Sequence, residues 1–447
     1  MEVAHSEPVA VGPFALRPPS RGAAVARVRR AGATGGLLLV LAAAVLLTVR
    51  AAAGPSLLVP AGARAFPGWL AGPLAGLGGG HGTPATLTVT LGALLAGWLL
   101  ALAGARDLPV RALGAAALAA HVVFLLGPPL FSADVFGYIG FARLQVVHHL
   151  DPYRFGTGWA PHDPVHAYLR WRNARSPYGP LFTVSSRAVV PLGVAGGLWA
   201  FKLLACAASL AGVALVARLL GREGRDPRPA VVLMGLNPLV LAFAVGGGHN
   251  DPLVVLAWLA GVALVLTRRT AAGAGTFVVA AALKVTGGLV APFALAGTRD
   301  RRAAAGGLAA AGAAVLALTL ATVGRHSTAW LTASANAAGG VATHSVPMTV
   351  ARAFGATRIA PDARLALVLA VAAVVAALLV RAWRGADWLA CAGWATLAVL
   401  CGSTWLLPWY ATWLTPLAAL GESRRLRAAT VALVVFLTLT RIPAAGL

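Results

Sequence analysis

The sequence predicts an all-α protein that crosses a membrane many times. Of its 447 residues, 59% are hydrophobic and only 11% are charged, whereas a soluble globular domain carries about 25% charged residues. Apolar runs of about 20 residues, the length that a helix needs to cross a bilayer, recur along the whole chain. Since no stretch is polar enough to form a separate soluble domain, we expect a single integral-membrane domain over residues 31–447.

The net charge of +23 comes almost entirely from arginine, because the only lysines are Lys202 and Lys284. A strongly basic chain can bind nucleic acid. Here, however, the arginines cluster in short loops between apolar runs, as the positive-inside rule describes for cytoplasmic loops. We therefore expect membrane lipids, not nucleic acid, as partners of these loops. The three cysteines lie in apolar runs without metal-ligand spacing, so no metal site is expected.

Residues 1–30 are Pro-rich and basic and predict a disordered cytoplasmic tail. Spans are expected at about 35–53, 86–104 and 113–130. The basic loop 106–111 lies between the second and third spans and is cytoplasmic by its charge. The chain therefore leaves the third span on the outer side, with the N-terminus inside.

The longest polar stretch, residues 131–180, is the predicted main extracytoplasmic loop. A solvated connection is one reading of such a loop. Its density of acidic, histidine, arginine and aromatic residues beside a membrane span favours a functional site. Its arginines suit phosphate or pyrophosphate, although some of them are expected to pair with Asp151, Asp163 or lipid head groups.

Lys284 marks a predicted break. A single span over 273–297 would place this lysine mid-membrane and Arg299 outside. Two short helices that meet at 284–288, where two glycines permit a bend, avoid both problems. Broken helices often place a site at membrane depth, so Lys284 is expected to be functional, whereas Lys202, early in a span, is expected to extend toward the interface.

The remaining segments complete a bundle of about 13 spans with a second outer segment at 324–362. Further spans are expected at 194–220, 230–245, 253–266, 303–323, 364–380, 388–401 and 428–440. In this topology the polar candidates gather on one face, whereas a transporter is expected to carry polar residues toward both faces. Three alternatives remain at this stage: His249–Asp251 as a helix cap, Trp405 and Trp409 in an interfacial belt, and His344 in a structural hydrogen bond.

No nucleotide-binding loop, zinc-protease motif or serine nucleophile elbow is present in the sequence. A lipid-linked sugar donor suits the remaining residue types. Its phosphate would meet Arg or Lys, its sugar would stack on aromatic rings, and a carboxylate near the acceptor hydroxyl would act as general base. Asp134 lies directly after the third span, where a membrane helix is expected to leave the bilayer.

Five motifs in order carry a family resemblance: Pro128–Tyr138 (PPLFSADVFGY), Leu150–Tyr153 (LDPY), Ser176–Phe182 (SPYGPLF), Gly248–Asp251 (GHND) and Ala282–Thr286 (ALKVT). Together they resemble the actinobacterial polyprenol-phosphomannose-dependent α-1,6-mannosyltransferases, which belong to the GT-C superfamily. The resemblance extends over most of the chain.

The resemblance implies a GT-C-like helical bundle with large extracytoplasmic loops in a bacterial plasma membrane. It implies an inverting transfer of mannose from polyprenyl-phosphate mannose to a mannoside glycolipid acceptor of the lipomannan type, in the cell envelope and without a cofactor or metal. The family's base maps onto Asp134. Many relatives read Asp-Val-Tyr-Ser-Tyr where this chain has Asp-Val-Phe-Gly-Tyr, a departure that retains the acid.

This hypothesis assigns the donor phosphate to Lys284, Arg143 and Arg172. Two alternatives are a GT-C transferase for another polyprenyl-phosphate sugar, such as arabinose, and a lipid or solute transporter. The candidate substrate-binding residues are Tyr138, Asp151, Tyr153, Tyr178, His249, Asn250, Asp251, His344, Trp409 and Tyr410.

Overall fold

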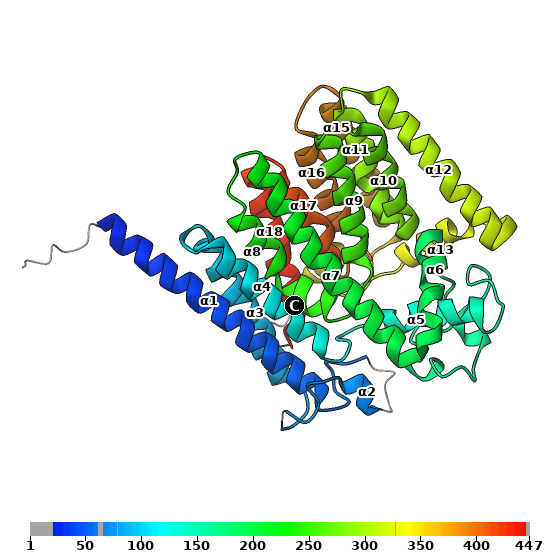
Figure 1. Ribbon diagram of the computed structural model, residues 1–447, viewed down its shortest axis with the longest axis horizontal. Coiled ribbons are helices and arrows are strands. Elements are labelled where there is room, and N and C mark those ends of the chain that lie inside the picture. The colour runs from blue at the N-terminus through cyan, green and yellow to red at the C-terminus, as the bar shows by residue number, and fades with distance from the viewer. Residues whose placement is uncertain (1–20, 61–65, 78, 327, 444–447) are drawn as a thin grey trace, which may run out of the picture.

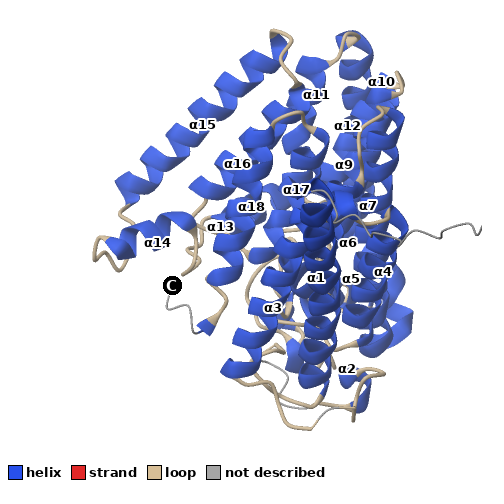
Figure 2. Ribbon diagram, turned by 90° about the vertical axis from the view of Figure 1, so that its left-hand side faces the viewer, coloured by secondary structure: helices blue, strands red, loops and turns tan. Residues whose placement is uncertain are grey.

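The structure is a computed structural model that describes residues 21–60, 66–77, 79–326 and 328–443. In this part of the chain every regular element is a helix (Figure 2). The α-helices are α1 (Arg21–Ala52), α2 (Gly68–Ala71), α3 (Pro84–Ala103), α4 (Val110–Leu126), α5 (Asp134–Val146), α6 (Pro180–Ser185), α7 (Gly193–Arg222), α8 (Arg228–Gly235), α9 (Asp251–Leu266), α10 (Thr270–Leu283), α11 (Ala291–Gly297), α12 (Arg301–Val323), α13 (Ala329–Ala338), α14 (Val346–Ala353), α15 (Pro361–Trp383), α16 (Trp388–Gly402), α17 (Ala411–Leu420) and α18 (Arg424–Leu439).

Five helical segments are long and apolar enough, by length and composition, to cross a membrane: Val25–Ala52, Pro84–Ala103, Pro180–Arg222, Arg301–Val323 and Pro361–Trp383. Shorter apolar helices, among them α4, α9, α10 and α16, pack with them. The all-α membrane class is thus confirmed. The total of about 13 spans stays a prediction.

The predicted disorder is wrong for residues 21–30, which form the first turns of α1. Alanine and arginine are strong helix formers, and extending an existing helix avoids the cost of starting a new one. The helix formed by the apolar part of α1 therefore extends into this basic segment. Residues 1–20 lie outside the described residues.

Glycines set two close helix crossings. A Cβ on Gly36 of α1 would lie 2.6 Å from the Gly97 carbonyl of α3, and a Cβ on Gly97 would lie 2.7 Å from the Gly36 carbonyl. Gly261 of α9 and Gly273 of α10 face each other in the same reciprocal way. Small residues that let backbones approach are the usual basis of helix association in membranes.

The predicted break at Lys284 is confirmed. Helix α10 ends at Leu283, Lys284 is extended (φ −157°, ψ 132°), and a 3-10 helix, η6 (Val285–Val290), turns the chain into α11. The turn packs tightly, since a Cβ on Gly287 would overlap the Ala280 carbonyl. The lysine thus lies at the tip of a two-helix hairpin, as the charge distribution around it predicts.

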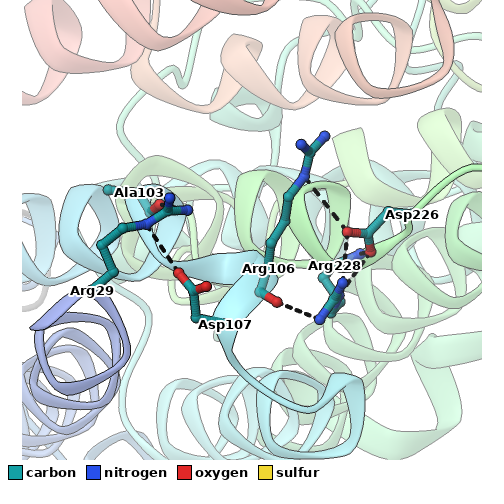
Figure 3. Close-up of polar contacts among 6 residues, drawn as sticks. All are labelled: Arg29, Ala103, Arg106, Asp107, Asp226 and Arg228. Carbon is teal, nitrogen blue, oxygen red and sulfur yellow. Dashed lines mark hydrogen bonds and ion pairs between the residues drawn. The ribbon is translucent and has the colours of Figure 1, made fainter. Parts of the chain in front are cut away.

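Charged side chains from three segments meet in one cluster (Figure 3). Arg29 of α1 pairs with Asp107 at 3.0 Å, while Asp226 pairs with Arg106 at 3.6 Å and with Arg228 at 2.9 Å. These side chains come from α1, from the turn between α3 and α4, and from the turn between α7 and α8. All three segments are ones that the arginine pattern assigns to the cytoplasmic side.

The predicted outer segments also meet one another. The Ser334 hydroxyl of α13 donates to the Pro177 carbonyl at 2.6 Å, and the Ala342 N–H donates to the Thr404 carbonyl at 2.8 Å. Figure 1 shows α5 and α6 close together, and the two helices pack on each other. Because the Phe131 N–H donates to the carbonyl of Leu58, six residues beyond the C-terminal end of α1, the start of the main loop lies at the far end of α1 from Arg29.

Candidate active site

Asp134 is the first residue of α5 and follows a sharply turned segment that leaves α4. Phe131 has a φ of 61°, and the Leu130 N–H donates to the Gly246 carbonyl at 3.1 Å. The backbone N–H of Asp134 donates to the Ser132 hydroxyl at 3.2 Å. The carboxylate is 20% exposed. It sits at a helix N-terminus, where the helix dipole favours negative charge.

His249 is the closest ionisable neighbour of this carboxylate. Its Nδ1 lies 3.6 Å from Asp134 Oδ2, and its ring stacks on Trp409 with 3.8 Å between centroids. Burial and the nearby charge of Lys284 hold the pKa of His249 well below its ordinary value. The imidazole is therefore neutral near pH 7. The stacked, 7% exposed Trp409 is part of the site, and the interfacial-belt interpretation is wrong for it.

Burial raises the pKa of the Asp134 carboxyl to about 6, although the positive charge of Lys284 acts in the opposite direction. A group with this pKa is mostly ionised at pH 7.5 yet accepts a proton more readily than an ordinary aspartate. This is the property that a general base requires.

A second carboxylate lies deeper. Asp251 Oδ1 accepts hydrogen bonds from Lys284 Nζ and from Trp413 Nε1, each at 2.7 Å. The Lys284 ammonium also lies 5.1 Å from the Tyr410 ring centroid and 5.4 Å from that of Trp413. The break in the helix therefore places the Lys284 ammonium between two aromatic rings, with the Asp251 carboxylate as its counter-ion.

The segment 249–251 does not use its side chains as a helix cap. Asn250 occupies the N-cap position of α9 without a side-chain capping bond. Its backbone N–H donates to the Tyr138 hydroxyl at 3.3 Å, and that hydroxyl donates to Asn250 Oδ1 at 3.5 Å. The Tyr138 ring in turn packs edge-on against Tyr178 at 4.9 Å. The helix-cap interpretation of these side chains is therefore wrong.

Within the described residues, several buried polar atoms in this cluster have no hydrogen-bond partner. They are both ring nitrogens of His249, Asn250 Nδ2, Asp251 Oδ2 and Thr286 Oγ1. A buried polar atom without a partner costs about 1–3 kcal/mol, so such atoms usually have a role. Donors and acceptors of this kind are what a polyhydroxylated ligand requires.

Lys202 is the residue that sequence reasoning misplaced. It is fully buried, and its ammonium donates to the carbonyls of Phe124 (2.9 Å), Gly127 (2.7 Å), Pro128 (3.0 Å) and Gly246 (3.2 Å). The expected extension toward the interface is wrong, because the carbonyls freed at the end of α4 and in the glycine loop satisfy the ammonium inside the protein. Lys202 thus ties together the segments that lead to Asp134 and to His249.

The predicted arginines lie apart from this cluster. Arg143 Nε bonds the Asp163 carboxylate at 2.8 Å, and His148 approaches the same carboxylate at 2.7 Å. Arg172 is exposed and donates to the His166 carbonyl at 3.3 Å. Pairing with a loop acid, the alternative left open above, therefore describes Arg143, and the phosphate role of both arginines stays a prediction.

Three further candidates lie in the predicted outer loops. The Asp151 carboxylate accepts from the Tyr153 N–H at 2.8 Å and lies 3.2 Å from His326. The Tyr153 hydroxyl donates to the Tyr178 carbonyl at 2.9 Å. His344 is half-buried just before α14, where burial lowers its pKa. The first two stabilise the loop that presents Tyr178 to the site.

Trp413 and Trp171 are the residues that sequence reasoning missed. Trp413 lies one helical turn after Trp409, so it falls on the same face of the chain, and this spacing is the signal that points to it. Trp171 stands among arginines in the polar loop with no local pattern to distinguish it. The described residues contain no group of three or more His, Cys, Asp or Glu side chains that could hold a metal.

A helical membrane bundle with a carboxylate at a helix N-terminus, a caged lysine and an aromatic wall is typical of a membrane-embedded enzyme. The family model described as "Alpha-(1->6)-mannopyranosyltransferase, N-terminal domain" matches residues 29–298. These residues include Asp134, His249, Asp251 and Lys284, whereas the aromatic residues of η8 (Pro408–Tyr410) and α17 lie beyond them.

Curated relatives agree with this match. The chain is 31% identical over 393 residues to alpha-(1->6)-mannopyranosyltransferase A of Mycobacterium tuberculosis, covering 79% of this chain and 75% of the relative. It is 30% identical over 180 residues to the protein of the same name in Corynebacterium glutamicum, covering 38% and 36%. No solved structure matches the chain.

The chain belongs to the alpha-(1->6)-mannopyranosyltransferase family and is a glycosyltransferase. The transporter alternative is thereby set aside.

Proposed function

We propose that this protein is an inverting GT-C-type transferase that moves mannose from polyprenyl-phosphate mannose to a mannoside glycolipid acceptor, forming an α-1,6 linkage of the lipomannan type. Asp134 is the proposed general base. The single observation that carries this proposal is the half-buried Asp134 carboxylate, whose pKa burial raises to about 6, beside the Lys284 cation. The family match supports the choice of mannose.

In the proposed reaction, the acceptor hydroxyl oxygen attacks the anomeric carbon while the bond from that carbon to the phosphate oxygen breaks. Asp134 takes the hydroxyl proton, and the lipid phosphate leaves with the bonding electrons. One displacement inverts the anomeric configuration, so an α-linked product comes from a β-linked donor. A single base is sufficient, because phosphate is a good leaving group and no second carboxylate has to protonate it.

Lys284 is the proposed partner of the leaving phosphate. Its ammonium reaches the site from the tip of the α10–η6 hairpin and is 14% exposed. Asp251 and the rings of Tyr410 and Trp413 hold it in place. A preorganised cation stabilises developing phosphate charge without reorganising when the charge appears. In this proposal no metal or other cofactor takes part.

The buried polar atoms of His249, Asn250 and Asp251 are the proposed partners of sugar hydroxyls. They lie on one loop directly behind Asp134, and Tyr138 and Tyr178 support that loop from α5 and from the main loop. Hydroxyl recognition by buried polar groups is selective, because a sugar that lacks the matching hydroxyl leaves them without partners.

We place the site at the outer face of a bacterial plasma membrane. Support comes from the arginine-rich turns around Arg29, Arg106 and Arg228, which meet at the far end of α1 from Asp134. Arginine-rich short loops are typical of the cytoplasmic side. The polyprenyl chain of the donor and the lipid anchor of the acceptor then lie in the bilayer.

The test is transfer of labelled mannose from synthetic polyprenyl-phosphate mannose to short α-mannosides by purified protein. Asp134→Asn is expected to lower the rate at least about 100-fold, which is the size of a general-base contribution. Asp226→Asn makes the same chemical change at the other end of the bundle and is expected to retain transfer.

Normal transfer by Asp134→Asn would show that another group acts as base. Wild-type protein that accepts only a different polyprenyl-phosphate sugar, such as arabinose, would show that the mannose assignment is wrong while leaving the reaction class intact.

A further inference from the structure

Two tryptophans from separate predicted outer segments pack against each other. Trp171 lies in the main loop, and Trp405 lies between α16 and η8. Their ring centroids are 6.3 Å apart at an interplanar angle of 71°. Trp171 is 52% exposed and Trp405 is half-buried. A large aromatic ring that remains open to solvent beside a site is typical of ligand-binding surfaces.

The pair borders the reacting groups. The Trp171 side chain lies close enough to the Asp134 carboxyl to offset a small part of the rise in its pKa. Trp405 lies five residues before Tyr410, whose ring lies 5.1 Å from the Lys284 ammonium. His249 occupies the buried side of Asp134. An acceptor hydroxyl that reaches Asp134 therefore approaches along the tryptophan side.

Hydrogen bonds fix the backbone segments that carry the two tryptophan rings. The Ala174 N–H donates to the Trp171 carbonyl at 3.1 Å, and the Gly158 N–H donates to the neighbouring Arg172 carbonyl at 2.6 Å. The Trp405 N–H donates to the Ser403 hydroxyl at 3.1 Å. A Cβ on Gly340 would lie 2.5 Å from the Trp405 ring, so the second outer segment packs directly against that ring. Binding to such a surface loses little entropy.

We propose that Trp171 and Trp405 form the acceptor platform of the enzyme, on which a pyranoside ring of the acceptor packs its C–H face while its hydroxyl points to Asp134. This inference rests on the proposed function and adds to it a binding surface for the acceptor. The indole face carries partial negative charge and the sugar C–H groups partial positive charge. The donor phosphate is assigned to Lys284, so the platform acts on the acceptor alone.

The test compares Trp171→Ala with Trp159→Ala. Trp159 is the matched control, because it lies in the same loop, is 69% exposed and packs against Phe155 with 5.0 Å between centroids. Trp171→Ala is expected to raise the acceptor KM about five- to tenfold, the size of one aromatic contact. The donor KM and kcat are expected to change less than about threefold. Trp171→Phe is expected to retain most of the affinity, and Trp159→Ala all of it.

Binding of a short α-1,6-linked mannoside without donor, measured by isothermal titration calorimetry, gives a second readout. Trp171→Ala is expected to weaken it by the same factor as the KM. An unchanged acceptor KM and unchanged binding in Trp171→Ala would overturn the proposal, and so would a rise confined to the donor KM. If wild-type protein transfers no mannose, the proposed function fails, while the calorimetry still tests the platform.

Discussion

Lys284 and Asp251 form an ion pair with 2.7 Å between Nζ and Oδ1, across the join of the broken helix and α9. Asp251 is fully buried, and its second carboxylate oxygen has no hydrogen-bond partner in the part of the chain that the structure describes. The ion pair therefore has two effects. The Lys284 ammonium neutralises the buried Asp251 carboxylate, and the carboxylate holds the ammonium in a fixed position in the site. Removing one partner leaves an uncompensated buried charge, which costs about 3–5 kcal/mol.

Lys284→Met is expected to lower both the thermal midpoint and the transfer rate, because it leaves the Asp251 carboxylate buried without its cation. The double variant Lys284→Met/Asp251→Asn is expected to recover most of the midpoint but not the transfer. Thermal unfolding in detergent and the transfer assay measure the two effects. Recovered transfer in the double variant would show that Lys284 serves only to neutralise Asp251.

The pH dependence of transfer is expected to follow Asp134. Burial raises the pKa of this carboxyl to about 6, and the base must be ionised to accept a proton. The value of kcat/KM is thus expected to rise with pH through about 6 and to level off above 7. His249, whose pKa lies well below its ordinary value, stays neutral over this range. A profile that is flat from pH 5 to 8 would contradict the assignment of Asp134 as base.

The ionised Asp134 carboxylate is also expected to lower the stability of the folded protein. Its folded-state pKa lies above the unfolded value, so the folded protein binds the proton more tightly. The stability contributed by Asp134 is therefore lost as the pH rises from about 4 through 6. Asn at this position avoids the buried charge. Asp134→Asn is expected to have a higher thermal midpoint than wild type at pH 8, with the difference shrinking toward pH 4. An equal or lower midpoint at pH 8 would refute this expectation.

Lys202→Met is expected to lower kcat at least about tenfold, because four carbonyls lose a shared donor and the segments carrying Asp134 and His249 loosen. The acid limb of the pH profile is expected to move as the surroundings of Asp134 change. Lys202→Arg is expected to restore part of the rate, since guanidinium has five N–H donors.

The control for Lys202 is Leu198→Ala, a fully buried position one turn earlier on α7. It is expected to lower the thermal midpoint without moving the pH profile. If both variants lose stability and neither moves the profile, Lys202 has a packing role and does not position the site.

Local sequence features were sufficient for some parts of the site. The end of an apolar run places Asp134 where α4 has finished and α5 begins. Two glycines and a misplaced charge predict the break at Lys284. These features depend on neighbours within about one helical turn, where propensity and hydrophobic pattern act directly. Local features do not predict which distant residues become partners. For Arg143, the sequence allowed either a phosphate or a loop acid as partner, and in the folded protein Asp163 lies beside it.

The sequence by itself determined that this is a helical membrane protein, that its polar residues cluster in a few segments, and that Asp134 and Lys284 occupy special positions. Only the tertiary structure decided that Asp251 holds Lys284, that Trp413 binds the same carboxylate, and that Lys202 serves four carbonyls. The physical reason is that apolar runs and glycines favour a helix or a bend through interactions between residues that are close together in the sequence. A buried ion or hydrogen bond between distant segments is satisfied only by whichever partner the packing of helices brings near.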